Sequence, residues 1–209
     1  LLLAACQAKP LPGGMEEAAL LDAGQEALLM LAGGDYEGVF GLLREDVAEA
    51  LTAEDIRLGN QLALLEMIST GTTSYSDMYF EPQTAVENAL ACGIKANISR
   101  PVQCFDKNES YAGNFRARES IQLFQDFHGA GDGRVRIDFS VHAEYTCFEH
   151  IVGPYSADCK ALGGRMHIHL SETKKEHDEC VEKYGKTPAR WFYDLGTFDC
   201  PTAAAHCVF

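Results

Sequence analysis

From about residue 50 to the last residue, short apolar runs alternate with segments that have the apolar spacing of a helix. The runs that predict strands lie at 72–80, 94–102, 135–143, 165–170 and 202–208. The segments that predict helices lie at 53–69, 82–92, 116–127, 148–162, 173–184 and from Thr187-Pro188 onward. Strands that alternate with helices predict a parallel sheet of the α/β class. The pattern alone leaves open whether this is an open doubly wound sheet or part of a barrel.

The same pattern divides the chain into two parts. Residues 1–50 are rich in Ala, Leu and Gly without a clear period, so they form an irregular N-terminal segment with no assignment. Residues 51–209 carry the alternating elements. In their first helix, Thr52 is the predicted N-cap, and the spacing of Leu58, Leu62 and Leu65 places these three side chains on one face.

Composition and charge narrow the class of partner. The chain has a formal net charge of -14, from 31 acidic and 17 basic residues. This charge would repel a phosphate backbone, so we expect no nucleic-acid partner and a small neutral or cationic substrate instead. No apolar run reaches the about 18 residues that a membrane span requires, so we expect no membrane partner. No strand is followed by a glycine-rich phosphate loop, which removes support for a nucleotide-phosphate role.

Cysteine use indicates a reducing compartment. The eight cysteines include no Cys-x-x-Cys pair and are scattered through the predicted helices and strands. They predict free thiols and a cytoplasmic location, in preference to a disulfide framework. The same spacing gives little support to a non-enzymatic module that binds metal through Cys and His.

One predicted strand carries two histidines and is followed by a carboxylate. His167 and His169 are two residues apart, so both side chains point to the same face of the strand. Glu172 follows where the strand ends. Imidazole is a common zinc ligand, and a carboxylate beside a metal-bound water can move its proton. This run therefore predicts metal-assisted hydrolysis, with His167 one layer deeper as a residue that packs against or orients its neighbour.

Two other predicted strands also carry a histidine near their C-terminal ends. His142 is followed closely by Glu144, and His206 lies in the last strand. In parallel sheets covered by helices, active sites form where the C-terminal ends of neighbouring strands meet. A single histidine at a strand end is more often structural, but three together with Glu172 favour a functional site.

At these residues the sequence resembles the amidohydrolase superfamily, and within it the methylthioadenosine / S-adenosylhomocysteine deaminases, next to the triazine chlorohydrolases. The motifs that carry the resemblance are His142-Ala143-Glu144-Tyr145-Thr146-Cys147, His167-Ile168-His169-Leu170-Ser171-Glu172-Thr173, Ala204-Ala205-His206-Cys207-Val208, Glu66-Met67-Ile68-Ser69-Thr70-Gly71-Thr72-Thr73 and Asp77-Met78-Tyr79-Phe80. The resemblance implies a metal-dependent (β/α)8 barrel of the TIM type. Residues 51–209 would be an incomplete barrel that holds about strands two to six.

The resemblance also implies roles and a reaction. His169 would bind one divalent metal ion, zinc as the first expectation and iron as the second. Glu172 would carry a proton from the metal-bound water to the leaving amine, and His206 would position the attacking hydroxide. His142 would contact the substrate, and Arg100 its polar tail. The implied enzyme is an aminohydrolase that deaminates purine-type substrates such as S-adenosylhomocysteine or methylthioadenosine.

The sequence departs from the family pattern at the metal ligands. The family places a His-x-His pair on its first barrel strand and an Asp at the end of its eighth, but no histidine precedes His128, and the predicted strands stop at about the sixth. Only His169 of the four expected ligands can be placed, and a catalytic zinc site usually needs three. Three alternatives therefore stay open: impaired catalysis, a catalytically inactive fragment or degenerate homologue, and another activity such as guanine deaminase or chlorohydrolase. Open sheet edges of an incomplete barrel would favour a homo-oligomer.

Overall fold

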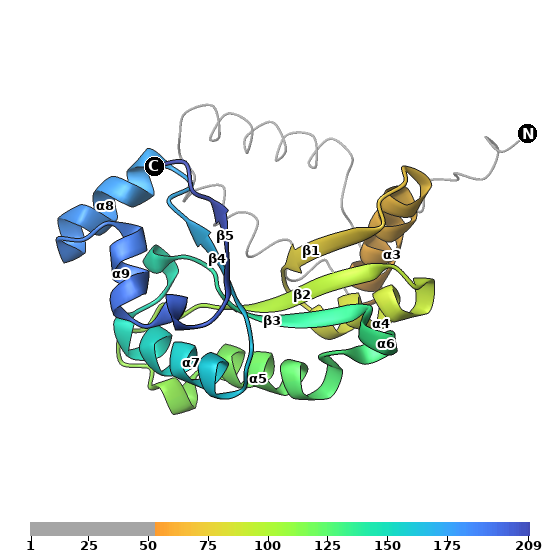
Figure 1. Cartoon of the computed structure of the whole chain (residues 1–209), viewed down its shortest axis with the longest axis horizontal. Helices are drawn as coiled ribbons and strands as arrows, with labels where there is room; N and C mark the ends of the chain where they lie inside the picture. Colours follow the sequence, from red (N-terminus) through yellow and green to blue (C-terminus); the bar gives the residue numbers. More distant parts are fainter. Residues whose placement is uncertain (1–52) are drawn as a thin grey trace, which may run out of the picture. The chain divides into compact units, whose positions relative to one another are not determined.

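The computed structural model describes residues 53–209, with side chains from residue 56 onward. Its centre is one sheet of five strands, in which every neighbouring pair is parallel and the strands lie in chain order (Figure 1). The strands are β1 (Ser74–Met78), β2 (Lys95–Val102), β3 (Val135–Val141), β4 (Met166–Leu170) and β5 (Thr202–His206). The sheet curls from β1 to β5, so that it forms a half-barrel. The predicted parallel α/β sheet is confirmed, and the barrel alternative holds.

Helices connect the strands at the predicted places. They are α3 (Ala53–Ser69), α4 (Pro82–Cys92), α5 (Phe115–Phe127), α6 (Ala130–Gly133), α7 (Glu149–Ala161), α8 (Lys174–Tyr184) and α9 (Pro188–Asp194), with short 3-10 helices η1 (Tyr111–Gly113), η2 (Glu144–Thr146) and η3 (Thr197–Asp199). Local chemistry sets their ends. The Thr173 hydroxyl accepts a hydrogen bond from the Glu176 backbone N–H at the start of α8, and Thr187 caps α9 in the same way. Gly93 ends α4 at φ 78°, a conformation that glycine adopts without strain.

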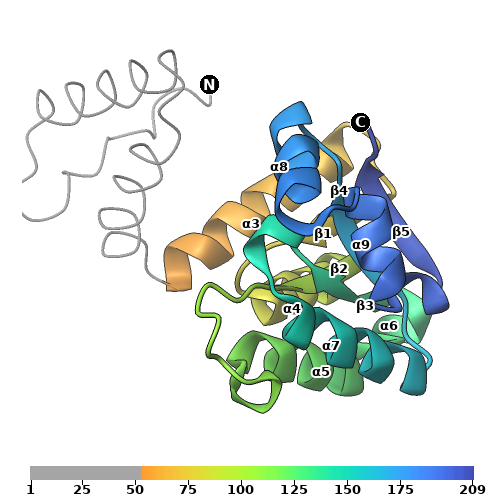
Figure 2. The same cartoon turned by 90° about the vertical axis from the view of Figure 1, so that its left-hand side faces the viewer.

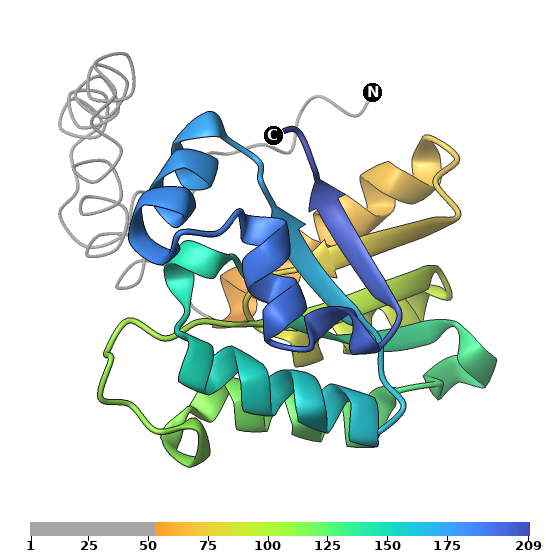
Figure 3. The same cartoon turned by 60° about the vertical axis from the view of Figure 1, so that its left-hand side comes forward.

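The hydrophobic core lies between the outer face of the sheet and its helices. Figures 2 and 3 show α4, α5 and α7 covering this face. Phe139 is fully buried there, and its ring lies 5.1 Å from the ring of Phe124 on α5 and 5.4 Å from that of Tyr155 on α7. Other core side chains lie at alternate positions of the strands, on the same face of the sheet as Phe139. They include Ile98, Val102, Ile137, Val141, Met166 and Ile168.

The opposite face of the sheet is polar. Because side chains alternate along a strand, Asp138 points away from the Phe139 side, and it is 1% exposed. Its Oδ2 accepts hydrogen bonds from Asn97 of β2 and from Arg165, which precedes β4, each at 2.8 Å. His167 and His169 of β4 share this face. The inner face of the half-barrel is therefore polar, and it is the face from which His169, a predicted site residue, projects.

The first helix packs differently from the pattern in the sequence. The face of α3 that carries Leu58, Leu62 and Leu65 is exposed, since these side chains are 45%, 66% and 65% exposed. The helix packs through Leu64, which joins the core cluster with Val86 of α4. Within residues 53–209, no helix is long and apolar enough to cross a membrane. The predicted N-cap Thr52 and the irregular segment 1–50 lie outside the described residues.

Candidate active site

The structure brings together the three histidines that the sequence places at strand ends. The ring of His169, at the end of β4, lies between the rings of the other two. Its centroid is 5.2 Å from that of His142, just after β3, and 5.3 Å from that of His206, at the end of β5. The parallel register explains this arrangement, because the C-terminal ends of neighbouring strands meet at one edge of the sheet.

His169 is oriented by its neighbouring strand. Its ring Nδ1 lies 2.8 Å from the carbonyl oxygen of His142. A carbonyl oxygen only accepts hydrogen bonds, so Nδ1 must carry the proton and donate it. The lone pair of the ring therefore resides on Nε2. This is the arrangement that metal-binding histidines commonly have, with one ring nitrogen donating to a fixed acceptor and the other nitrogen free to act as a ligand.

His142 is held by a residue that the strand-end argument does not find. The Thr146 hydroxyl, in η2, donates to the carbonyl oxygen of Ala143 at 3.0 Å, so its oxygen accepts from His142 Nδ1 at 3.2 Å. This assigns the proton to Nδ1 and leaves Nε2 as an acceptor. Burial lowers the pKa of His142, with a further lowering from His169 and an opposing effect from Glu172. A neutral ring at neutral pH suits contact with a substrate.

Glu172 and His206 face each other across the ends of β4 and β5. The Oε2 atom of Glu172 lies 3.5 Å from His206 Nε2, and both side chains remain accessible, at 47% and 36% exposed. The backbone N–H of Glu172 donates to Glu176 Oε2 at 3.0 Å, and so does the N–H of Thr173. The first turn of α8 thus fixes the backbone that carries Glu172, while its carboxylate stays free toward His206.

The backbone is strained at this same edge. Ser171, His206 and Cys207 have φ of 49°, 71° and 53°, and Glu81, just after β1, has φ of 51°. Side-chain-bearing residues adopt this left-handed region at a cost of order 1–3 kcal/mol each, and such residues gather at functional sites. Of the five non-glycine residues with positive φ among residues 53–209, these four lie at C-terminal strand ends.

His167 lies one layer below His169 on the inner face, with ring centroids 6.3 Å apart. Burial lowers the pKa of His167 most, while Asp138 opposes this and His169 and Arg165 add to it. Its Nδ1 is buried without a hydrogen-bond partner. The placement agrees with the predicted supporting layer, and the role of His167 stays a prediction.

Arg100 is not brought to these residues. Its side chain is 6% exposed and points into the helical layer, where its Nε donates to Glu119 Oε2 of α5 at 2.6 Å. Its guanidinium carbon lies 5.6 Å from the ring centroid of Phe80 and 6.0 Å from that of Phe115. Arg100 has the same parity in β2 as Ile98 and Val102, which face the helices. We therefore leave Arg100 out of the site, and its predicted contact with a substrate tail gains no support.

The metal that the resemblance implies fits these residues in part. The chemistry of His169 suits a ligand, because its Nε2 lone pair is free and its Nδ1 is anchored. Among residues 53–209, no group of three or more His, Cys, Asp or Glu side chains is arranged to hold a metal ion. The part of the chain that the structure describes thus supplies one oriented ligand, while a stable zinc site needs about three from protein.

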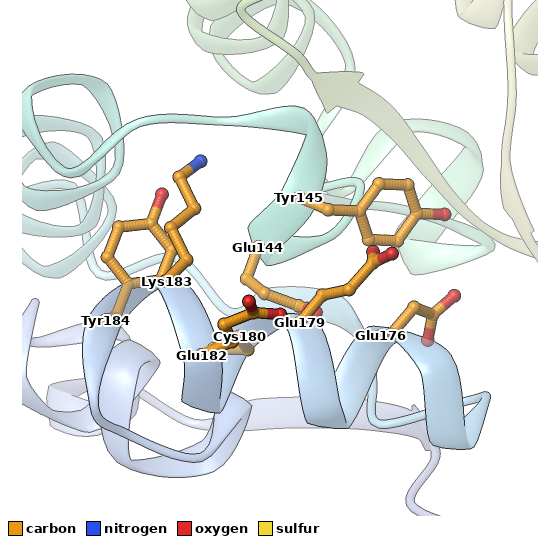
Figure 4. Close-up of a pocket in the computed structure, with 8 residues that line it drawn as sticks. All are labelled: Glu144, Tyr145, Glu176, Glu179, Cys180, Glu182, Lys183 and Tyr184. Atoms are coloured by element: carbon orange, nitrogen blue, oxygen red, sulfur yellow. The ribbon is translucent and has the colours of Figure 1, made fainter.

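A separate acidic pocket lies next to the site, between η2 and α8 (Figure 4). Its volume is about 450 Å³, and Glu144, Glu176 and Glu179 are among its lining residues. Glu144 is 2% exposed, and burial raises its pKa to about 7, with further contributions from Glu176 and Glu179. Tyr145 separates this pocket from the histidines, since its ring meets His142 edge-on at 5.9 Å between centroids.

The comparisons with known proteins define the class. The amidohydrolase family model matches residues 25–209, so the chain belongs to the amidohydrolase family. A 5-methylthioadenosine/S-adenosylhomocysteine deaminase from Caldanaerobacter subterraneus subsp. tengcongensis is 39% identical over 158 residues, which cover 76% of this chain and 36% of that protein. The chain therefore spans little more than a third of the length of this relative.

Solved structures confirm the barrel fold. An adenosine deaminase from Xanthomonas campestris with bound zinc matches with a TM-score of 0.68 and 23% identity, over 76% of this chain and 36% of that one. An atrazine chlorohydrolase from Arthrobacter aurescens TC1 complexed with zinc matches with a TM-score of 0.69 and 19% identity, over 97% and 45%. The five strands are thus part of a TIM-type (β/α) barrel, as the sequence predicts.

Proposed function

We propose that His142, His169, Glu172 and His206 belong to the active site of a metal-dependent hydrolytic deaminase. The observation that carries the proposal is the line of three imidazoles at about 5 Å spacing with a free carboxylate beside the last one. Hydrolytic deamination needs a nucleophilic water and a group that moves its proton to the leaving amine. This edge of the half-barrel offers residue types for both tasks.

Each side chain has a role that its position supports. His169 Nε2 would hold one divalent metal ion, zinc or else iron, and such an ion lowers the pKa of a bound water to about 7. Glu172, open to solvent at its tip, would take a proton from the attacking water and return it to the departing amine. His206, within 3.5 Å of Glu172, would hydrogen-bond that water. Neutral His142 would contact the substrate through Nε2.

The substrate class in this proposal is adenine-type nucleosides and their thioethers, which would lose the exocyclic amine as ammonia. The similarity to a deaminase of 5-methylthioadenosine and S-adenosylhomocysteine supports this choice. The net charge of -14 agrees with a substrate that carries no phosphate. We expect the 209-residue chain by itself to turn over slowly at best, because its described part offers a single ligand where zinc enzymes use about three.

The alternative is a catalytically inactive homologue, and the observation that favours it is the absence of a three-residue metal group within residues 53–209. Another hydrolytic activity of the same family, on guanine or on a chlorinated ring, would use the same four side chains. These alternatives differ in what the purified chain binds and releases.

The test is ammonia release from S-adenosylhomocysteine, methylthioadenosine and guanine, with metal content measured on the same sample. We expect zinc-dependent release from the adenine-type substrates that falls at least about 100-fold in Glu172→Gln, since positioned acid–base catalysis contributes about 10²–10⁴-fold. Glu182→Gln is the matched control, because Glu182 is exposed on α8 and lines only the acidic pocket.

Three outcomes would count against the proposal. Release that survives Glu172→Gln would remove Glu172 from the mechanism. A preference for guanine would contradict the proposed adenine-type substrate class. A folded chain that binds no zinc and releases no ammonia would favour a catalytically inactive fragment or degenerate homologue.

A further inference from the structure

Two cysteines that are 41 residues apart in sequence meet in the core on the far side of the sheet from the histidines. Cys159 lies near the end of α7, and Cys200 lies between η3 and β5. Their Sγ atoms are 3.4 Å apart, which is contact distance for two reduced thiols. Cys159 is fully buried and Cys200 is 8% exposed. The chemistry proposed above uses neither residue.

The two thiols are not equivalent. Cys159 donates its S–H toward Cys200, which lowers the pKa of Cys200 to about 7, while burial and Asp199 oppose the shift and the Thr202 hydroxyl assists it. The pKa of Cys159 is raised by the same contact and by burial. The other buried thiols with a resolved shift, Cys104, Cys147 and Cys180, all have raised pKa values, to about 11, 12 and 11. The pair thus joins a slightly exposed sulfur, whose S–H also donates to the Thr197 carbonyl at 3.4 Å, to a fully buried one.

A surface cavity lies near this pair in the sequence, although neither cysteine lines it. It has a volume of about 330 Å³ and lies between α7 and η3, lined among others by Ser156, Lys160 and Asp199. Lys160 and Asp199 are the chain neighbours of the two cysteines, and their ion pair, at 2.9 Å, is solvent-exposed at the surface. Access to the pair is therefore through Cys200, which keeps 8% of its surface exposed, while Cys159 has none.

We propose that Cys159 and Cys200 form a reversible dithiol–disulfide site that reacts with low-molecular-weight disulfides. The Cys200 thiolate attacks one sulfur of the small disulfide, forms a mixed disulfide and releases one small thiolate. The Cys159 thiol then loses its proton and attacks Cys200 Sγ, which forms the intramolecular disulfide and releases the second small thiolate. Two electrons pass from the protein to the small disulfide, and the released thiolates take up the protons.

The new bond would close a loop that contains β4, α8 and α9, and therefore His169 and Glu172. A disulfide across a loop of this length restricts the unfolded chain, so the oxidised form should melt at a higher temperature. It would also fix the segment that enters β5, at the opposite end of that strand from His206.

The test equilibrates the full chain with glutathione and glutathione disulfide at graded ratios under native conditions, blocks free thiols by alkylation and maps the peptides by mass spectrometry. We expect a Cys159–Cys200 cross-linked peptide that appears as the ratio becomes oxidising, disappears with reductant, and raises the Tm by several degrees. Cys159→Ser should trap the glutathione adduct on Cys200, while Cys200→Ser should leave Cys159 unmodified.

Cys92→Ser is the matched control, because Cys92 is exposed and free, and the variant should cross-link as the wild type does. The cross-link in the wild-type chain needs no variant, so the test stands even where a serine variant fails to fold. The proposal is overturned if native protein forms no Cys159–Cys200 bond at any ratio, or if the bond forms only after denaturation.

Discussion

The carbonyl oxygen of His142 accepts two hydrogen bonds from His169, one from the backbone N–H at 3.2 Å and one from ring Nδ1 at 2.8 Å. Backbone and side chain of His169 are therefore both tied to one atom of the neighbouring strand. A ring fixed in this way pays little further conformational entropy when it binds a ligand. Both contacts belong to the protein itself, since they join two neighbouring strands.

This arrangement predicts the effect of His169→Asn. The amide nitrogen of Asn can still donate to the His142 carbonyl, so stability should change by less than about 1 kcal/mol. The variant lacks Nε2, and zinc affinity should fall at least about 100-fold, since even the loss of an outer-shell partner of a metal site costs 10–100-fold. Zinc titration of both proteins measures this. His150→Asn is the control, since its ring contacts the Glu109 carbonyl and stacks on Phe148, and neither residue belongs to the candidate site. Zinc affinity in His169→Asn equal to that of the wild type would refute the ligand assignment.

Glu144 predicts a dependence of stability on pH. Its folded-state pKa is about 7, against an ordinary value of 4.5. Below pH 4.5 the Glu144 carboxyl is protonated in both the folded and the unfolded chain, so it does not change the free energy of unfolding. Between pH 4.5 and 7 the unfolded chain releases a proton that the folded chain keeps, so the free energy of unfolding falls as pH rises, and the loss is complete above pH 7. Glu144→Gln should thus be more stable than wild type by about 1–3 kcal/mol at pH 8 and similar at pH 4.

Urea unfolding at several pH values measures this difference. Glu182→Gln, a change on the exposed side of the same pocket, should leave the pH profile as it is. A Glu144→Gln profile parallel to that of the wild type would contradict the assignment of the slope to Glu144.

Strand alternation explains the position of some of the site residues and not of others. His206 is in register with Leu170, so alternation alone would place it on the face that meets the helices. His142, His169 and His206 were placed by the rule that strand ends converge, and the structure brings them together. The expectation for Arg100 used the strand end alone. Its parity with Ile98 and Val102 was available in the sequence and points it toward the helices. Thr146 could not be found in this way, because its contact with His142 depends on the shape of a turn.

At the scale of elements, α8 does more than cover the sheet. Its first turn holds Glu176 Oε2 against the backbone N–H groups of Glu172 and Thr173, and the Thr173 hydroxyl caps the helix in return. The helix start and the carboxylate proposed as proton carrier therefore share one set of hydrogen bonds. Disturbance of the cap should reach the chemistry through the backbone of Glu172.

Two substitutions at Glu176 test this link. Glu176→Ala removes the acceptor and should cost about 1 kcal/mol of stability together with part of the deaminase activity. Glu176→Gln keeps an acceptor oxygen at the same place, so it should restore most of both. Chemical denaturation and the ammonia assay provide the two readouts. If Gln and Ala variants were equally impaired in turnover, the charge of Glu176 and not its cap would be the relevant property.

Helix and strand positions followed from the sequence to within about two residues, because apolar period, caps and glycine stops all act locally. The face through which α3 packs against the rest of the protein did not follow from the sequence. Its sequence carries overlapping apolar rows, one through Leu58, Leu62 and Leu65 and another through Leu64 and Met67. The second row faces α4, where Gln61 also donates to the amide oxygen of Asn88. Polar contacts between helices decide such a choice, and a periodicity argument does not contain them.

At the scale of the whole molecule, the helical layer packs so closely on the sheet that one added methyl group between them should lower the stability of the protein. A Cβ at Gly164, just before β4, would lie 2.7 Å from ring atoms of Phe139 and 3.3 Å from the Cys159 carbonyl oxygen. The Phe139 ring is enclosed by Phe124 and Tyr155 and has little room to move. Gly164→Ala should therefore destabilise the protein by about 1–3 kcal/mol.

Gly59→Ala is the matched control, in the interior of α3, where an added Cβ would have no atom of another element within 4 Å. Here the change should be neutral or stabilise by up to about 1 kcal/mol, because alanine favours a helix over glycine. Thermal or urea unfolding distinguishes the two variants. A Gly164→Ala protein as stable as Gly59→Ala would show that the core at Phe139 adapts more than its contacts indicate.

The two faces of the half-barrel differ in role: the outer face forms the hydrophobic core with the helices, and the inner face carries residues of the candidate site. On the outer face of the sheet, apolar side chains at alternate strand positions pack against the helices. On the inner face, polar side chains occupy the positions in between, and His167 and His169 lie on this face. Both sets were visible in the sequence as alternation within β3 and β4. The sequence does not identify further metal ligands, and residues 53–209 contain no group of three or more His, Cys, Asp or Glu side chains that could hold a metal ion.

The strands of the sheet lie in the order in which they occur in the chain, and each pairs with the one before it. During synthesis, every new strand and helix can therefore dock on an edge that has already left the ribosome, without waiting for a distant partner. The three imidazoles would then assemble in sequence, His142 first, His169 against its carbonyl, and His206 last. Of these three histidines His206 would join last, so its place beside His169 depends on the units that fold before it.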